Sequence, residues 1–431
     1  MKKTILPALL LCSLLPAAHA VDIQRWQTPS GSRVLLIERH ENPIVDISVQ
    51  FDGSGHAADA PGQNGTADFA ASLLTNGTAQ LDEEAFNRRA DDLAISIGSS
   101  SDSEAAALSL RSLSRPQTLQ PALTLLHDAI VSPRYNAQVF HRTREQAILG
   151  LKQQESNPAF IASREADKLD YPGHPYSADS LTSTQSLQAV SLDAVKAFHR
   201  SHYGKNNAVV ALVGDLTRSQ AEDITRQLLD GLPEHAETAA IPPVAVHSGQ
   251  QRELPFASEQ AQIVMSMPLI SRNDPDYFAL VAGNYILGGG GFDSRLMKVL
   301  RDQKGYVYGV SSSLLPQREP GQFSIRFATK KANADDALQQ ARQVLRQMIQ
   351  EGPSEAELQQ AKDNIIGSFP LRFDTNAKLI GYLAMIGLYD LPSDWLDQYP
   401  QKIAALTTAD IKAAWQKRVR PENLNTVIVG R

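Results

Sequence analysis

The chain has 431 residues, of which 42% are hydrophobic and 20% charged, and its formal net charge is -6 at pH 7. This length allows two or more domains with their own hydrophobic cores, and the composition is that of an ordinary globular protein. The mild negative charge, without a basic block or lysines clustered among aromatic residues, argues against a nucleic-acid partner.

The first twenty residues have the pattern of a secretory signal peptide. Lys2 and Lys3 precede an apolar run from Ile5 to Leu15, and a small-x-small cleavage signal ends at Ala20. The run is too short to span a bilayer, so we favour cleavage after Ala20 and a periplasmic mature chain over a retained anchor. No later stretch is long enough to cross a membrane. The single cysteine, Cys12, lies inside the signal, so the mature chain has no disulfide and no thiolate chemistry.

Residues 21–232 are expected to form a first domain with strands, several helices and a final strand. "RVLLIER" (33–39) and "IVDISVQFD" (44–52) are expected to pair, and "SIGSSSDSEAAALSLRSL" (96–113) suggests a further strand pair. Helices are expected near 67–75, 82–94, 117–131, 137–153, 158–170 and 191–201.

A linker is expected at "PEHAETAAIPPVAVHSGQQ" (233–251), which is rich in proline, alanine and polar residues and lacks periodicity. Residues 252–431 are expected to form a second domain. Its predicted strands are "AQIVMSMPL" (261–269), "YVYGVSSSLL" (306–315) and "GQFSIRFAT" (321–329). Its predicted helices lie near 275–287, 293–302, 333–350, 354–368 and 374–388.

The ends of the two predicted domains are similar to each other. "VKAFHRSHYGKNNAVVALVG" (195–214) aligns without a gap on "IKAAWQKRVRPENLNTVIVG" (411–430). Each copy reads as an amphipathic helix, a polar turn and an apolar strand ending in Val-Gly, which favours a duplication. Since strands and helices do not alternate strictly, we expect an α+β fold of two homologous domains, each a mainly antiparallel sheet packed against helices.

The residues that carry hydrolytic metal chemistry are poorly represented. All ten histidines lie at or before His247, and none forms H-E-x-x-H or H-x-x-E-H. His199 and His202 lie three apart on a predicted helix, but without an acidic partner an exposed helix face is the better interpretation. We therefore expect no metal site in this chain.

Two further motifs have both a functional and a structural interpretation. Ser54, His56 and Asp59 lie close in sequence, but catalytic triads assemble from separated segments, so a polar loop after a strand is favoured. "LGGGGFDSRL" (287–296) lacks the Gly-Lys-Ser/Thr of a phosphate loop. Its glycines Gly288, Gly289, Gly290 and Gly291 instead predict a flexible hinge, or a backbone that comes close to something extended, such as a peptide.

Four segments are similar, in order and spacing, to the motifs of one peptidase family. "GTADFAASLLTNGT" (65–78) fits the frame Gly-Leu-Ala-His-Phe-x-Glu-His with a following Gly-Thr. "REQAILGLKQQESNP" (144–158) and "YPGHPYS" (171–177) match a later glutamate helix and a Gly-His-Pro-Tyr segment. "GGGGFDSRLMKVLRDQKGYVYGV" (288–310) is similar to Gly-Gly, Ser-Arg-Leu and Leu-Arg-x-x-x-Gly-x-x-Tyr. The mature chain thus resembles the pitrilysin/insulinase family of inverted zincins, which includes the mitochondrial processing peptidases.

The resemblance implies that the zinc site has been lost. The two histidines of H-x-x-E-H fall on Asp68 and Ser72, the glutamate base on Ala71, and the third zinc ligand on Gly150. Zinc needs at least three good ligands, and its water needs a base.

A second feature of the family is retained as Arg301 and Tyr308. In active members this pair comes from the half that faces the zinc and helps to hold the substrate carbonyl. A guanidinium and a phenol directed at that carbonyl stabilise the charge that grows in the tetrahedral intermediate.

These implications predict a non-catalytic, substrate-holding subunit of a heterodimeric periplasmic zinc peptidase. A homologous partner with intact H-x-x-E-H would supply zinc and base, and the assembly would close like a clam shell on an extended peptide that adds to a sheet edge of the partner. This chain would contribute Arg301, Tyr308 and the glycine loop, and no cofactor. The alternatives are a stand-alone peptide-binding or scaffold protein and, less favoured, a lone metallopeptidase with an unrecognised site.

Overall fold

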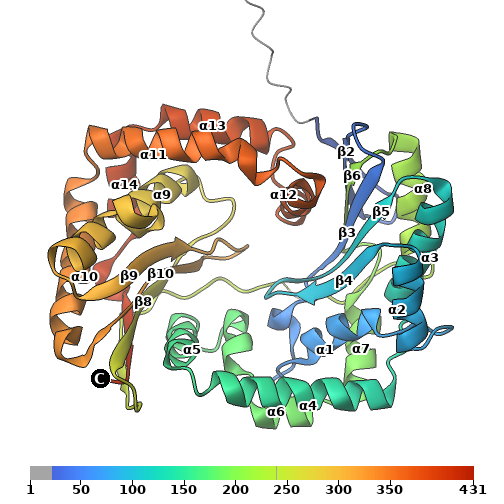
Figure 1. The fold of residues 1–431 in the computed structure, drawn as a ribbon, viewed down its shortest axis with the longest axis horizontal. Coiled ribbons are helices and arrows are strands. Elements are labelled where there is room, and N and C mark those ends of the chain that lie inside the picture. The colour runs from blue at the N-terminus through green and yellow to red at the C-terminus, as the bar shows by residue number, and fades with distance from the viewer. Residues whose placement is uncertain (1–21, 239) are drawn as a thin grey trace, which may run out of the picture.

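The computed structural model describes residues 22–238 and 240–431, so the expected signal peptide lies outside the described residues. Two β-sheets, one from each half of the chain, are each covered by helices and face a common centre (Figure 1). The expected α+β class is confirmed.

The first sheet has the strand order β1-β2-β6-β3-β5-β4. The expectation that the segments at 33–39 and 44–52 pair with each other is wrong, because the strand at the end of this half lies between them. β6 runs parallel to β2 and antiparallel to β3, and every one of its residues is buried. A continuously apolar strand such as "AVVALVG" is most stable at the centre of a sheet, where both faces are covered. The strands are β1 (Gln24–Gln27), β2 (Arg33–Glu38), β3 (Ile44–Asp52), β4 (Ser96–Ser101), β5 (Ala105–Leu113) and β6 (Ala208–Gly214).

The second sheet repeats this topology in the order β7-β11-β8-β10-β9. Its last strand, β11, is parallel to β7 and antiparallel to β8, as β6 is to β2 and β3. The internal similarity of the sequence thus corresponds to equivalent places in two sheets. The strands are β7 (Gln251–Leu254), β8 (Gln260–Ile270), β9 (Val307–Leu314), β10 (Gly321–Lys330) and β11 (Asn425–Val429).

Helices form the outer layers of both halves (Figure 1). Those of the first half are α1 (Thr66–Ser72), α2 (Glu83–Asp92), α3 (Pro116–Val131), α4 (Ala137–Gln154), α5 (Pro158–Asp170), α6 (Thr184–Ala189), α7 (Leu192–His202) and α8 (Arg218–Leu229). Those of the second half are α9 (Tyr277–Asn284), α10 (Ala334–Glu351), α11 (Glu355–Ser368), α12 (Asn376–Leu388), α13 (Trp395–Ala405) and α14 (Thr408–Arg418). Two π-helical turns, η5 (Tyr285–Gly289) and η7 (Met297–Gln303), follow α9. No helix among the described residues is long and apolar enough to cross a membrane.

One helix of each half packs on the sheet of the other half. α12 packs on β2, β3 and β6 of the first sheet, and α5 packs on β8 and β11 of the second. One buried cluster therefore joins Leu35 and Val209 of the first sheet to Leu379 and Leu383 of α12. This exchange buries apolar surface on both sides of the junction and favours one rigid body.

The α5 contact also contains two carboxylates with few compensating charges. The Gln322 side-chain amide donates to Asp167 Oδ1 at 2.7 Å and to Asp170 Oδ2 at 2.8 Å, while the Asn425 amide donates to Asp170 Oδ1 at 2.7 Å. Burial raises the pKa of Asp167 to about 7, aided by the charge of Asp170, and burial raises the pKa of Asp170 to about 6. The Arg326 guanidinium opposes both shifts without reversing them.

We therefore expect Asp167 and Asp170 to make a contribution to the free energy of unfolding that falls as the pH rises from about 4 to about 7. In this window the folded chain holds protons on Asp167 and Asp170 that the unfolded chain has released, and these protons are lost as the pH rises through the folded pKa values. Asp167→Asn keeps the oxygen that accepts from Gln322, and it should raise the free energy of unfolding at pH 8 and flatten the dependence of this free energy on pH. Urea titrations of the wild type and the variant from pH 4 to 8 measure this. An unchanged profile in the variant would contradict the assignment.

Candidate functional site

Helix α1 contains the sequence frame in which the family's zinc ligands are expected. Gly65 precedes it with a left-handed backbone (φ 105°), which favours glycine. The Asp59 carboxylate accepts hydrogen bonds from the Gly65 and Ala67 backbone N–H groups, both at 2.8 Å. Phe69 and Ala71 face the core of the first half, whereas the Asp68 side chain is 48% exposed. The helix thus has a rigid buried side and presents Asp68 on the other.

Asp68 forms a hydrogen-bonded pair with His56, which lies in a short helical turn before α1. His56 Nε2 lies 2.8 Å from Asp68 Oδ1, and its side chain is 16% exposed. Ser101, on the edge strand β4, donates to the same carboxylate oxygen. Three separate segments therefore meet at Asp68.

His56 is cationic in this environment. Burial by itself would lower the pKa of His56, but the hydrogen bond and charge of Asp68, with further charge from Asp179 and Asp59, raise it to about 9. Burial likewise would raise the pKa of Asp68, but the hydrogen bond to His56 and its charge lower it. At neutral pH the two side chains form an ion pair.

Asp179 completes a group that resembles a metal site in composition. One ligand atom each of His56, Asp68 and Asp179 lies within 4.8 Å of the others. The geometry does not fit zinc, however. Two ligands of one tetrahedral zinc lie about 3.3 Å apart, and each must direct a free lone pair at the ion. The 2.8 Å contact of His56 with Asp68 is instead a hydrogen bond, which uses the ring nitrogen that zinc would need.

The remaining positions of the family's site offer no replacement ligand. Ala71 is 1% exposed and belongs to the hydrophobic core, and Ser72 is exposed. Gly150 lies on α4 with open space where a side chain would begin, beside Leu149, which is 68% exposed. These side chains provide neither a third ligand nor a base.

Arg301 and Tyr308 lie together at the edge of the second sheet. Arg301 is on η7 and Tyr308 near the start of the edge strand β9, where its side chain is 92% exposed. The Arg301 guanidinium carbon lies 5.9 Å from the Tyr308 ring centroid and 4.7 Å from that of Phe292, which is also exposed. No acidic side chain of residues 22–238 and 240–431 forms a salt bridge with Arg301, so its guanidinium can donate to a ligand.

Phe292 is a part of this cluster that the sequence did not single out. The only signal was an aromatic residue directly after four glycines. Gly288 and Gly289 complete η5, whereas Gly290 and Gly291 form the turn that presents Phe292. A Cβ on Gly288 would lie 2.6 Å from the Ser312 backbone nitrogen, so the close neighbour of this glycine is the chain's own strand β9. Flexibility of the four glycines stays a prediction.

Ser54, His56 and Asp59 do not form a hydrogen-bonded triad with one another in the described residues, because each side chain has a different partner. Ser54 is fully buried and donates to the Phe51 carbonyl, while Asp59 serves the start of α1. His56 instead forms a hydrogen bond with Asp68, and the spacing of these residues in the sequence did not indicate this contact.

The expectation of an exposed helix face at His199 is wrong. The residue is 7% exposed, and its ring nitrogen Nε2 lies 2.8 Å from the Ile130 carbonyl oxygen. Burial lowers the pKa of His199 to about 4, so it is neutral and structural.

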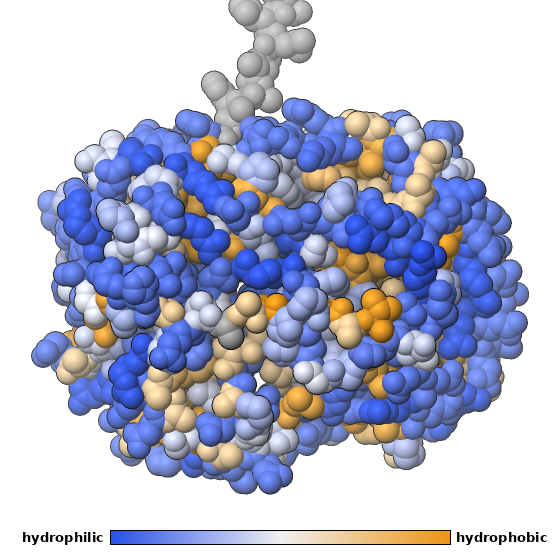
Figure 2. Space-filling view, turned by 180° about the vertical axis from the view of Figure 1, so that it is seen from behind, coloured by the Kyte–Doolittle hydropathy of each residue, from blue (hydrophilic) through white to orange (hydrophobic). Residues whose placement is uncertain are grey.

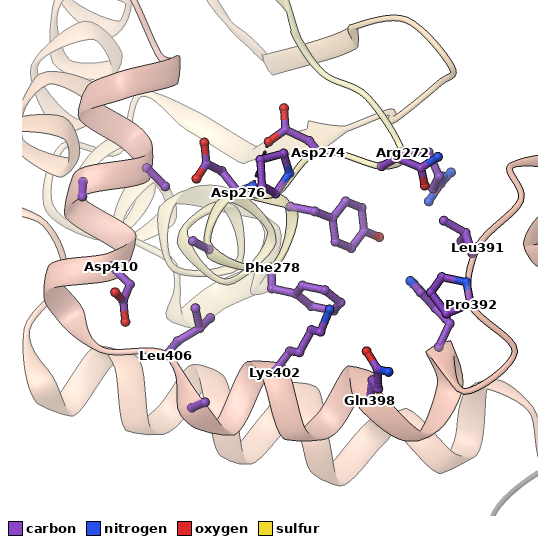
Figure 3. A pocket seen from close by; sticks show the side chains of 18 of the residues that line it. Arg272, Asp274, Asp276, Phe278, Leu391, Pro392, Gln398, Lys402, Leu406 and Asp410 are labelled. Atoms are coloured by element: carbon purple, nitrogen blue, oxygen red, sulfur yellow. Dashed lines mark hydrogen bonds between the residues drawn. The ribbon is translucent and has the colours of Figure 1, made fainter.

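His56 and Asp179 line a cavity of about 530 Å³ between the two halves, together with Arg272, Gln322 and Tyr389 of the second half. A larger cavity of about 830 Å³ lies elsewhere, between α9, α13 and α14 (Figure 3). Two of the aspartates that line it form salt bridges, Asp276 with Lys417 and Arg418 and Asp274 with Arg418. On the face in Figure 2, apolar side chains form small separate patches on a mainly hydrophilic surface.

Comparisons with known proteins show which family and which solved structures this chain is similar to. Residues 33–171 match the family model "Insulinase (Peptidase family M16)", and residues 189–365 match "Peptidase M16 inactive domain". A crystal structure titled as a peptidase M16 inactive domain, from Pseudomonas fluorescens, is 33% identical with a TM-score of 0.91, covering 95% of this chain and 97% of that one.

Two more distant relatives are similar over much of the chain. The "Non-peptidase homolog YmxG" of Helicobacter pylori is 26% identical over 344 residues, covering 79% of this chain and 78% of that protein. The periplasmic protease PqqL of Escherichia coli is 19% identical with a TM-score of 0.79, covering all of this chain and 49% of PqqL, and shares the fold.

Proposed function

This chain belongs to the insulinase family of peptidases, family M16, and on that premise we propose that it is the non-catalytic, substrate-holding subunit of a heterodimeric periplasmic zinc peptidase. The observation that carries the proposal is a contrast between the two halves. In the first half an ion pair of His56 and Asp68 stands at the family's metal position, and Ala71 is buried at the position of the base. In the second half Arg301 and Tyr308 remain adjacent and accessible.

In the proposed complex the zinc and the general base belong to a homologous partner with intact H-x-x-E-H. The Arg301 guanidinium and the Tyr308 hydroxyl would donate hydrogen bonds to the scissile carbonyl oxygen of a peptide held against the partner. Both donors stabilise negative charge that develops on this oxygen when water adds to the carbonyl. The Arg301 guanidinium carbon lies within 6 Å of the ring centroids of both Phe292 and Tyr308, at 4.7 Å and 5.9 Å, where the aromatic rings attract a cation.

The family match to an inactive domain and the name of the Helicobacter pylori relative support a chain without activity of its own. The N-terminal signal pattern and the periplasmic location in the name of PqqL support a periplasmic location.

A reconstitution experiment tests the proposal. The mature chain is mixed with a homologous chain that has an intact H-x-x-E-H motif, and cleavage of a quenched fluorescent peptide library is followed with and without a zinc chelator. We expect zinc-dependent cleavage by the mixture and none by this chain alone. Equal cleavage by the partner with and without this chain would contradict the proposal.

The accessible cluster of Arg301, Phe292 and Tyr308 also suits the second candidate, a stand-alone peptide-binding or scaffold protein. Arginine and aromatic side chains dominate the energetics of many protein interfaces. This candidate predicts peptide binding that needs no partner and that no pairing converts to cleavage. Binding and turnover measured on the same peptides separate the two functions.

A further inference from the structure

We infer that the positively charged side chain of His56 takes the place of a metal cation in this chain. The hydrogen-bonded His56–Asp68 ion pair, together with Ser101, holds together the segments that meet at this site. The inference concerns this chain alone and does not depend on a partner subunit. It rests on the charges that converge at the site, on the geometry of the contact, and on the way its members are anchored.

Several aspartate side chains converge at this site, and without His56 their negative charge would not be neutralised by a salt bridge from the described part of the chain. Asp68 and Asp179 approach each other to within 4.8 Å, and Asp59 lies at the start of the same helix. Converging carboxylates repel each other unless a cation lies among them. Among the described residues, His56 is the basic side chain that forms a salt bridge with these aspartates, through the contact of its ring nitrogen with Asp68.

The contact geometry favours a proton rather than a metal ion between the ring and the carboxylate. The 2.8 Å separation of Nε2 and Oδ1 is typical of a charge-assisted hydrogen bond. The Ser101 hydroxyl donates to this same oxygen, so Oδ1 already accepts two hydrogen bonds. A metal ion held by His56 Nε2 and Asp68 Oδ1 would have to displace the hydrogen bond between these two atoms.

The backbone fixes His56 in this position independently of the pair. The His56 N–H donates to the Asp102 carbonyl oxygen at 2.8 Å, and the Ala57 N–H donates to that of Ser103 at 2.9 Å. These bonds attach the turn that carries His56 to the loop joining β4 and β5. Ser101, at the end of β4, reaches Asp68 from the same side. The ion pair therefore joins α1 to the β4 edge of the first sheet, next to the cavity between the halves.

Zinc binding and thermal unfolding of the purified mature chain test the inference. After chelator treatment, ZnCl2 is titrated calorimetrically at pH 7, and CoCl2 is used to look for absorption bands of a protein-bound metal. Melting temperatures are measured for the wild type, His56→Gln, Asp68→Asn and the double variant. His127→Gln is the matched control, because His127 also contacts an aspartate, Asp128, at 3.0 Å but lies outside the site.

We expect no saturable zinc binding by the wild type and no rise in its melting temperature with zinc. Each single variant should melt roughly 2 to 4 °C lower, since one charge of the pair is left without its partner. The double variant should lose less than the sum of the two, because the second substitution removes a group that is already unpaired. His127→Gln should leave the melting temperature within about 1 °C of the wild type.

One zinc per chain, with a rise in melting temperature that His56→Gln or Asp68→Asn abolishes, would overturn the inference and make this a metal site. Strictly additive effects of the two substitutions would overturn it as well. These results are measured on this chain alone, whereas the reconstitution experiment measures cleavage by the mixture, so the failure of one idea is distinguishable from the failure of the other.

Discussion

Replacing Arg301 by alanine is expected to slow peptide cleavage by the reconstituted heterodimer about 100-fold or more, the usual effect of removing one donor to a developing oxyanion. Because Arg301 makes no salt bridge with the described residues and its neighbours Phe292 and Tyr308 are exposed, its loss should leave the fold intact. Tyr308→Phe removes only the hydroxyl and should slow cleavage to a similar degree. The measurement is kcat/KM for one quenched peptide, with the amount of heterodimer determined separately by size-exclusion chromatography.

Lys298→Ala is the matched control for Arg301→Ala. Lys298 is exposed on the same turn, η7, so the control removes an equal charge without removing a member of the cluster. We expect its kcat/KM to stay within a factor of about 2 of the wild type. Arg301→Ala and Tyr308→Phe heterodimers that cleave at the wild-type rate would refute the roles assigned to both side chains.

Adding one methyl group at Gly387 is expected to destabilise the junction between the halves. A Cβ at this position of α12 would lie 2.6 Å from Leu35 Cδ1 and 2.6 Å from Val209 Cγ1, both in the first sheet. Since this core is closely packed, Gly387→Ala should lower the free energy of unfolding by about 1–3 kcal/mol. Chemical denaturation at pH 7, followed by tryptophan fluorescence, measures the change.

The same helix contains the control. Gly381, six residues earlier on α12, has nothing within 4 Å of its ideal Cβ position. Gly381→Ala should therefore be neutral or should stabilise the chain by up to about 1 kcal/mol through its better helix propensity. An equal free energy of unfolding for Gly387→Ala and Gly381→Ala would contradict the close packing of α12 on the first sheet.

The exchange of α5 and α12 has a consequence for the proposed assembly. Because each half covers its sheet partly with a helix of the other, the two halves are expected to move together. Any closure around a peptide would then take place between this chain and its partner, and not by opening of the junction within this chain. This geometry suits a rigid subunit that presents Arg301 and Tyr308 at a fixed place.

Local patterns in the sequence were sufficient for much of the fold. Apolar periodicity predicted most helices and strands, and the similarity of 195–214 to 411–430 predicted two related sheets. Such features depend on neighbouring residues, whose spacing determines which side of a helix or strand is apolar. The family frames also predicted which ligand positions had lost their chemistry, because the side chain at a motif position can be read directly.

The tertiary structure alone decided which distant segments meet. The insertion of β6 between β2 and β3, and the docking of α5 and α12 on the opposite sheets, depend on which surfaces are buried together, and the apolar pattern of one segment does not specify its partner. The same holds for the site. The sequence by itself determined which residues stand at the family's motif positions, Asp68, Ala71, Ser72 and Gly150, and predicted that they do not form the family's zinc site. Only the fold placed His56, Ser101 and Asp179 around Asp68, because a hydrogen bond or ion pair depends on distances of a few ångströms that the spacing of residues along a chain does not set.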